Sequence, residues 1–132
     1  MAEVPLVAIV DDDASALAAG ASLIRALGFA ASGFTTVAAF LASDALTLAV
    51  CVVVDVRMPE MGGFELLRRL VALERQVPTV LATAFPDAVE RSWALTMGAI
   101  DYLSKPLRAE DLLRCVRLAA TVRGATSGGG PG

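Results

Sequence analysis

Hydrophobic residues along this chain form five short runs, separated by longer segments in which apolar residues recur at helical spacing. The runs cover residues 4–10, 29–34, 50–54, 77–83 and 100–103. Runs of this length, bounded by turn residues, are typical of buried strands. The segments after them place apolar side chains three or four positions apart, as amphipathic helices do. The pattern predicts five strands that alternate with helices.

The predicted helices follow the strands at 14–27, 36–43, 64–73, 87–97 and 109–123. Asp13 or Ser15 could cap the first helix, because either side chain can accept hydrogen bonds from its free N–H groups. Gly28 and Gly98 stand where two helices are expected to end, a frequent place for glycine. Residues 124–132 are Gly-rich and have nothing to pack against. We therefore expect one domain over 1–123, followed by a disordered tail or linker.

Strands and helices that alternate in this way form a parallel sheet with helices on both faces, a three-layer α/β/α architecture. In such sheets, ligands bind beyond the carboxyl ends of the strands. Those ends carry Asp11 and Asp12 after the first strand, Asp55 after the third, Thr83 after the fourth and Lys105 after the fifth. We therefore expect three carboxylates, one hydroxyl and one ammonium group to meet at one edge of the sheet.

Composition and charge exclude several classes of function. The chain is 56% hydrophobic and 19% charged, with a net charge of −3, so it lacks the basic surface of a nucleic-acid-binding protein. The first residues lack the positive segment of a signal peptide, and no apolar run reaches the ~20 residues that span a bilayer. We expect a cytoplasmic protein without a membrane partner. The chain has no His and only two Cys, which argues against zinc sites and His-based catalysis.

The residues expected at the sheet edge suit phosphoryl transfer. Clustered carboxylates repel one another unless a cation lies among them, and a hard divalent ion with oxygen ligands, Mg²⁺ or Mn²⁺, satisfies that need. Lys105 is the chain's only lysine, and an ammonium group binds phosphate oxygens well. With Thr83 as a further hydrogen-bond donor, the set describes a site in which the carboxylate of Asp55 is the nucleophile.

Four segments resemble the receiver domain of two-component response regulators, the superfamily of the chemotaxis regulator CheY, and most closely its FixJ-type branch. They are VAIVDDD at 7–13, VDVRMPEMGG at 54–63, LATA at 81–84 and GAIDYLSKP at 98–106. The resemblance covers the chain from about residue 4 to 123. It implies a flavodoxin-like, doubly wound sheet of strand order 2-1-3-4-5.

The resemblance also implies roles for individual residues. Asp55 would accept a phosphoryl group from a sensor histidine kinase or a phosphotransfer protein. Asp11 and Asp12 would hold Mg²⁺ together with Asp55 and the backbone carbonyl of Arg57. Lys105 would pair with the phosphoryl oxygens, and the Lys105–Pro106 peptide bond would be cis.

A switch in conformation is implied as well. Thr83 would move to bond the phosphoryl group, and Tyr102 would rotate inward behind it. The loop after Thr83 and the face formed by the 87–97 helix, the last strand and the last helix would then change. Arg57 and Phe85 would tune how long the phosphoryl group persists. The domain would be a phosphoacceptor switch with weak catalytic ability of its own rather than an enzyme.

The chain departs from the family pattern at two surfaces. Leu17 stands in the first helix where relatives commonly carry a basic residue, which predicts a more apolar contact with the kinase. Trp93 occupies a position that is often polar, so it is either packed in the core or an exposed anchor. With Arg114 and Arg117 on the last helix, an exposed Trp93 would mark the face for a downstream target or a homodimer.

Two other functions and two forms of output remain open. An aspartate-nucleophile phosphohydrolase of the haloacid-dehalogenase kind needs a second Asp two residues after the nucleophile. This chain has Arg57 there, which argues against that function. A pseudo-receiver that only binds partners would not need the full set of acidic residues and lysine. The output is either that of a stand-alone receiver or that of the receiver part of a transcription regulator.

Overall fold

Five parallel strands form a single sheet in the computed structural model, which describes residues 4–129 and the side chains of residues 4–122. The strands are β1 (Leu6–Val10), β2 (Ala30–Phe34), β3 (Cys51–Asp55), β4 (Thr79–Thr83) and β5 (Asp101–Ser104). They lie side by side in the order β2-β1-β3-β4-β5. This doubly wound, flavodoxin-like order confirms the predicted fold class.

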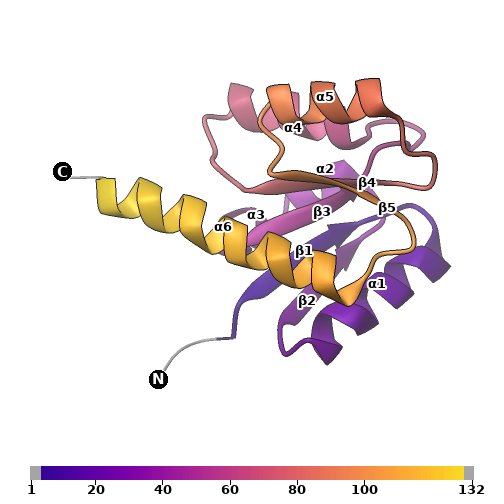
Figure 1. The fold of residues 1–132 in the computed structure, drawn as a ribbon, viewed down its shortest axis with the longest axis horizontal. Coiled ribbons are helices and arrows are strands. Elements are labelled where there is room, and N and C mark those ends of the chain that lie inside the picture. Colours follow the sequence, from indigo (N-terminus) through magenta and orange to yellow (C-terminus); the bar gives the residue numbers. More distant parts are fainter. Residues whose placement is uncertain (1–3, 130–132) are drawn as a thin grey trace.

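Helices cover both faces of the sheet (Figure 1). One face carries α1 (Ala14–Ala26) and α6 (Ala109–Gly129), and the other carries α2 (Val37–Leu41), α3 (Ala45–Leu48), α4 (Gly63–Ala72) and α5 (Ala88–Thr96). Each face encloses its own hydrophobic core. Ile24 and Leu112 belong to the core beneath α1 and α6, whereas Phe40 and Leu66 belong to the opposite one. Both faces of the sheet are buried, as expected for a parallel sheet with helices on both sides.

The segment between β2 and β3 differs from the prediction, because it contains two short helices instead of one. The hydroxyl of Ser43 donates to the Phe40 carbonyl at 2.8 Å and accepts from the Ala45 N–H at 3.1 Å. These bonds turn the chain from α2 into α3. A helix of four residues is too short to show helical periodicity, so the pattern missed it.

The first helix is capped by Asp13 and not by Ser15. The Asp13 carboxylate accepts hydrogen bonds from the N–H groups of Ser15 at 2.9 Å and Ala16 at 3.1 Å. At the other end of α1 the chain passes through Gly28, whose φ is 95°. Residues with a side chain rarely adopt this left-handed conformation, so the glycine fits the end of the helix.

The last helix is longer than the sequence predicts. It was expected to end near residue 123, but α6 runs from Ala109 to Gly129. Although it has 21 residues, neither α6 nor another helix in the described part of the chain is both long and apolar enough to span a membrane. Residues 124–129, which were expected to belong to a disordered tail, continue α6, and residues 130–132 lie outside the described residues. The division between a receiver over 1–123 and a following tail or linker stays a prediction.

Both cysteines lie in the core beneath α1 and α6. Cys51 and Cys115 are fully shielded from solvent, and burial raises the pKa of each thiol to about 12. The thiols therefore stay protonated at neutral pH and act as small apolar side chains.

Candidate functional site

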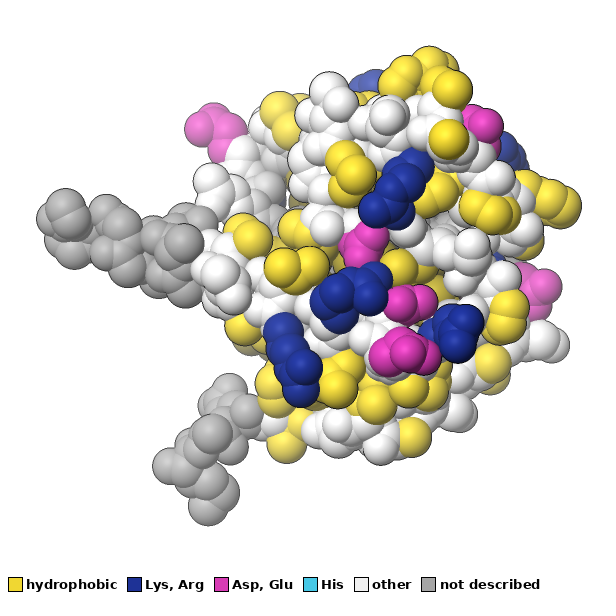
Figure 2. Space-filling model, in the orientation of Figure 1, with side chains coloured by type: hydrophobic (Ala, Val, Ile, Leu, Met, Phe, Trp, Pro, Cys, Tyr) yellow, Lys and Arg dark blue, Asp and Glu magenta, His cyan; other side chains and the backbone are white. Residues whose placement is uncertain are grey.

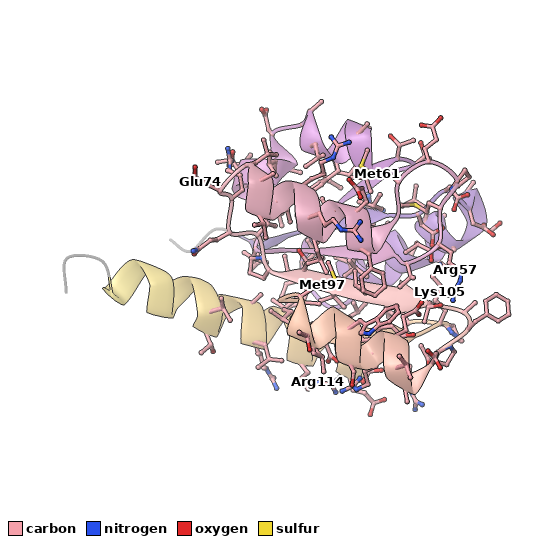
Figure 3. All side chains as sticks on the ribbon, turned by 90° about the horizontal axis from the view of Figure 1, so that it is seen from above. Arg57, Met61, Glu74, Met97, Lys105 and Arg114 are labelled. Carbon is pink, nitrogen blue, oxygen red and sulfur yellow. The ribbon has the colours of Figure 1, made fainter. Side chains whose placement is uncertain are left out.

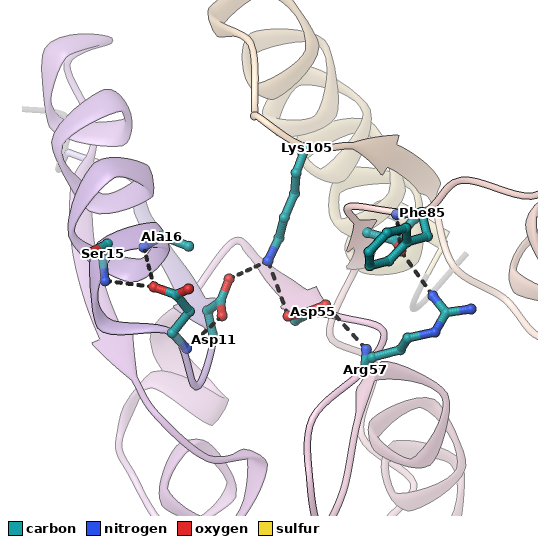
Figure 4. A network of polar contacts seen from close by, with 9 residues as sticks. Asp11, Ser15, Ala16, Asp55, Arg57, Phe85 and Lys105 are labelled. Carbon is teal, nitrogen blue, oxygen red and sulfur yellow. Dashed lines mark hydrogen bonds and ion pairs between the residues drawn. The ribbon is translucent and has the colours of Figure 1, made fainter.

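The carboxyl ends of four strands bring the predicted site residues together. Asp11 follows β1, Asp55 ends β3, Thr83 ends β4 and Lys105 follows β5. The register pairs Asp55 with Ala82, the residue before Thr83. Figure 4 shows side chains from these separate strand ends pointing toward one another. Parallel pairing alone thus gathers residues that are up to 94 positions apart in the sequence.

Three carboxylates form the acidic part of the site. One oxygen each of Asp11, Asp12 and Asp55 lies within 4.8 Å of the others. Asp11 is buried, Asp55 is half-buried and Asp12 is exposed. The single charge of Lys105 does not balance three carboxylates, so the donor set fits a hard divalent cation with oxygen ligands.

Lys105 bridges two of these carboxylates. Its Nζ donates to Asp11 Oδ2 at 2.5 Å and to Asp55 Oδ2 at 3.1 Å (Figure 4). Partial burial alone would lower the pKa of Lys105, but the hydrogen bonds to Asp11 and Asp55 outweigh it and the pKa is raised. Lys105 is therefore an ammonium ion at neutral pH. Its peptide bond to Pro106 is cis, as the resemblance implied.

Thr83 and Arg57 are joined beside Asp55. Thr83 is buried, and its Oγ1 accepts hydrogen bonds from the Phe85 N–H at 3.0 Å and from Arg57 Nη1 at 3.1 Å. The Arg57 N–H donates to Asp55 Oδ1 at 3.2 Å. The sequence predicted for Arg57 only a metal-binding backbone carbonyl and an effect on how long the phosphoryl group persists. The contact of its guanidinium with Thr83 was not predicted. Phe85 is largely exposed at the rim of the site.

Tyr102 already points inward in this structure. It is only 5% exposed, and its hydroxyl donates to Glu90 Oε1 at 2.5 Å while accepting from the Asp87 N–H at 3.1 Å. Burial and the neighbouring Glu90 carboxylate raise the pKa of Tyr102. Glu90 was missed by sequence reasoning, because an acidic residue in the first turn of a helix is explained by the helix dipole alone.

This site matches a known family. A sequence-family model described as "Response regulator receiver domain" matches residues 7–117. The chain belongs to the response regulator receiver family. The family assignment confirms the predicted resemblance and gives no support to the haloacid-dehalogenase alternative.

Named relatives agree with the assignment. The chain is 40% identical over 111 residues to "Response regulator protein TmoT" of Ectopseudomonas mendocina, covering 84% of this chain and 50% of that protein. It is 35% identical over 112 residues to "Transcriptional regulatory protein FixJ" of Bradyrhizobium diazoefficiens, covering 84% and 54%. The receiver thus spans about half the length of the curated relatives that it matches.

Solved structures give the same result. The structure titled "Low Resolution Structure of Response Regulator StyR" superposes with a TM-score of 0.82 at 33% identity, covering 98% of this chain and 67% of that one. "CRYSTAL STRUCTURE OF FIXJ-N" superposes with a TM-score of 0.79 at 30% identity, covering 92% and 96%. The likeness to FixJ in both sequence and structure confirms the predicted branch of the family.

Leu17 of α1, which was expected to contact the kinase, is only partly accessible at the surface. Leu17 is half-buried, and its side chain packs toward Gly33 of β2. A cavity of about 410 Å³ lies between α1 and the segment 105–107, and it reaches Asp55. The apolar lining of this cavity comes from residues such as Ala16, Ala19 and Leu107 rather than from Leu17. A contact between Leu17 and a kinase stays a prediction.

The α5-β5-α6 face of the receiver carries Trp93 and a cluster of ion pairs. Trp93 is 62% exposed, so the alternative of core packing is wrong. Arg114 Nη2 lies 2.9 Å from Asp101 Oδ2, and Arg114 Nη1 lies 3.1 Å from Asp111 Oδ1. Figure 2 shows acidic and basic side chains next to one another across this side of the molecule, and Figure 3 shows Arg114 well apart from Arg57 and Lys105. Arg114 thus links α6 to β5 by an ion pair. Arg114 and Arg117 are both exposed.

Asp101 gives the receiver a pH-dependent contribution to stability. Burial alone would raise the pKa of Asp101, but hydrogen bonds from Arg114 and the Tyr102 N–H hold it below the usual value. A carboxylate with a lowered pKa in the folded state stabilises the fold above its unfolded pKa of about 3.9. This stabilisation is lost as the pH falls through the lower pKa of the folded state.

Asp101→Asn should therefore lower the free energy of unfolding at pH 7 by about 2 kcal/mol, because it removes a largely buried charged acceptor. The difference from the wild type should shrink as the pH falls below about 4. Urea unfolding of the variant and the wild type at several pH values measures this difference in the free energy of unfolding. Asp111→Asn removes the same charge from an exposed i,i+3 pair with Arg114 and should cost about 0.5 kcal/mol or less. If Asp101→Asn lowered the free energy of unfolding equally at pH 7 and pH 3, the pH-dependent stabilisation ascribed to the Asp101 carboxylate would be wrong.

Proposed function

We propose that this receiver accepts a phosphoryl group on Asp55 from a sensor histidine kinase or a phosphotransfer protein. The observation that supports it most strongly is the double contact of Lys105 Nζ, which bridges Asp55 and Asp11 at the edge where three carboxylates meet. Asp55 is half-buried at the end of β3, the central strand of the sheet, so its carboxylate is positioned by the sheet and still accessible to a donor.

The transfer exchanges one bond for another. A carboxylate oxygen of Asp55 attacks the phosphorus of a phosphohistidine, so an O–P bond forms as the P–N bond breaks. The electron pair of that bond returns to the imidazole, which takes a proton from solvent. Lys105 pairs with the phosphoryl oxygens, and the Thr83 hydroxyl donates to one of them. Water later attacks the phosphorus, which restores the carboxylate and releases inorganic phosphate.

Asp11, Asp12 and Asp55 would hold Mg²⁺, or Mn²⁺, with the backbone carbonyl of Arg57 as a further ligand. When bound, the ion supplies positive charge that neutralises the phosphoryl oxygens during transfer. The fit rests on three carboxylates within 4.8 Å, an arrangement that Lys105 alone leaves negative. Lys105 keeps Asp11 and Asp55 from repelling each other before the ion arrives.

The phosphoryl group would then act as a switch. Thr83 moves toward it, the loop over 84–87 follows, and the α5-β5-α6 face around Tyr102 and Trp93 changes. A target protein or a second copy of the chain would read that change in the cytoplasm. Arg57 and Phe85 stand at the rim of the site and would limit the approach of water, so they tune how long the phosphoryl group persists.

Labelling with a small phosphoryl donor tests this function. Phosphoramidate carries a P–N bond like that of phosphohistidine, and with Mg²⁺ it should give a covalent adduct that is stable in acid and labile in base. Chelation of the metal should reduce labelling by more than about tenfold, since the ion neutralises the transferred group. Intact-mass analysis measures the extent of labelling with and without the chelator, and peptide analysis identifies the labelled residue. An adduct that forms equally well with a chelator, or that maps to a hydroxyl residue, would contradict the proposal.

A further inference from the structure

Glu90 connects two side chains that come from separate elements. It lies in the first turn of α5, and its side chain is only 13% exposed. One carboxylate oxygen accepts the Tyr102 hydroxyl at 2.5 Å, and the other lies 3.3 Å from Arg57 Nη2. Arg57 in turn donates to Thr83 Oγ1 at 3.1 Å. A single carboxylate thus holds Arg57 on Thr83 and Tyr102 in its inward position.

The Arg57 side chain is exposed enough to swing away from Thr83 and Glu90. Its side chain is 55% exposed, and its guanidinium is held by Thr83 and Glu90 at the tip. Its backbone N–H donates to Asp55, so the side chain begins directly beside the proposed phosphoacceptor. Guanidinium groups bind phosphate oxygens through two parallel hydrogen bonds. A phosphoryl group on Asp55 would therefore compete with Glu90 for Arg57.

We propose that Glu90 is a positioning residue that retains Arg57 on Thr83 and away from Asp55 while the receiver is unphosphorylated. This inference rests on the proposed function of Asp55. When Arg57 turns to the phosphoryl oxygens, Thr83 Oγ1 loses its guanidinium donor and Glu90 is left with Tyr102 alone. Glu90 thus opposes phosphorylation. It also links the phosphorylation site to Tyr102, because the Glu90 carboxylate binds both Arg57 and Tyr102 before phosphorylation and only Tyr102 afterwards.

Glu90→Gln separates the two functions of this carboxylate. The amide oxygen can still accept the Tyr102 hydroxyl, but the charge that holds Arg57 is gone. The negative charge of residue 90 then no longer competes with a phosphoryl group for Arg57. Beryllofluoride, which mimics a phosphoryl group on a carboxylate oxygen, should bind about fivefold more tightly to Glu90→Gln than to the wild type in the presence of Mg²⁺. Titration followed by ¹⁹F NMR measures the bound fraction.

A double-mutant cycle shows whether Glu90 acts through Arg57. Arg57→Met keeps much of the side chain's length and removes the guanidinium. In that background, Glu90→Gln should leave the affinity for beryllofluoride unchanged. Glu65→Gln is the matched control, because Glu65 pairs with Arg68 at 2.8 Å and Arg69 at 3.2 Å on α4. It removes the same charge away from the site and should bind beryllofluoride as the wild type does.

Three results would overturn the inference. Glu90→Gln could bind beryllofluoride as the wild type does, it could gain the same factor in the Arg57→Met background, or Glu65→Gln could gain as much. Each would show that Glu90 does not hold Arg57 against a phosphoryl group. Wild-type protein that binds no beryllofluoride would instead contradict the proposed role of Asp55, and the inference with it. The two failures are thus distinguishable.

Discussion

Asp55→Asn should lower the rate of phosphoryl labelling by more than about a hundredfold, because it removes the proposed nucleophile. An amide oxygen is a poor nucleophile at neutral pH, and the variant also loses one of the two carboxylates that Lys105 bridges. The comparison is made with phosphoramidate and Mg²⁺, with the adduct counted by intact mass.

The fold itself should tolerate this change. Asn has nearly the shape of Asp, and its amide oxygen can still accept the Arg57 N–H that Asp55 Oδ1 accepts at 3.2 Å. Circular dichroism and thermal unfolding should therefore resemble those of the wild type, so that lost labelling cannot be ascribed to unfolding.

Asp44→Asn provides a matched control for the chemistry. Asp44 is exposed and precedes α3, where its side chain makes no capping hydrogen bond. This variant should label at the wild-type rate. Labelling of Asp55→Asn at the rate of Asp44→Asn would mean that another residue accepts the phosphoryl group, and the proposed function would be wrong.

The convergence of the site residues could be predicted because it follows from topology. Asp11, Asp55, Thr83 and Lys105 each stand at the carboxyl end of an apolar run, and parallel strands bring those ends to one edge. Strand limits that shift by one or two residues do not change which edge they reach. The order of apolar runs and of the polar residues that follow them was therefore sufficient to predict which residues meet at the site, without knowledge of side-chain geometry.

The contacts between side chains could not be predicted in the same way. Glu90 and Asp101 each have a simple local explanation, one as a residue favoured near a helix start and one as a residue at a strand end. Their observed partners, Arg57 for Glu90 and Arg114 for Asp101, come from other elements. Which arginine reaches which carboxylate depends on how helices pack on the sheet, and hydrophobic patterning fixes that packing only approximately.

Trp93 illustrates the same limit at the surface. A single tryptophan in an amphipathic helix fits either the core or an exposed position, because the ring is large and can be partly buried in both. The structure leaves it 62% exposed on α5, whereas Ala94 beside it is fully buried. One residue of helical rotation decides the outcome, and a sequence pattern rarely defines helix rotation that finely.

Gly62→Ala should be the most damaging change to the fold among the glycines near the site. A Cβ built on Gly62 would lie 2.1 Å from the Val56 carbonyl oxygen. That oxygen belongs to the backbone, and Val56 is itself fixed by its N–H bond to Ala82 at 2.9 Å. Since neither side can give way without moving the loop between β3 and α4, we expect a loss of about 3 kcal/mol in the free energy of unfolding.

Thermal unfolding measures this loss, which corresponds to a decrease of about 10 °C in Tm for a chain of this size. Gly33→Ala is the control, because its new Cβ would meet the flexible end of Leu17 at 3.2 Å and should cost less than about 1 kcal/mol. The loop that Gly62 closes also carries Arg57. A Gly62→Ala protein that still folds should therefore bind Mg²⁺ more weakly than Gly33→Ala, and equal affinities would show that this loop does not shape the proposed metal site.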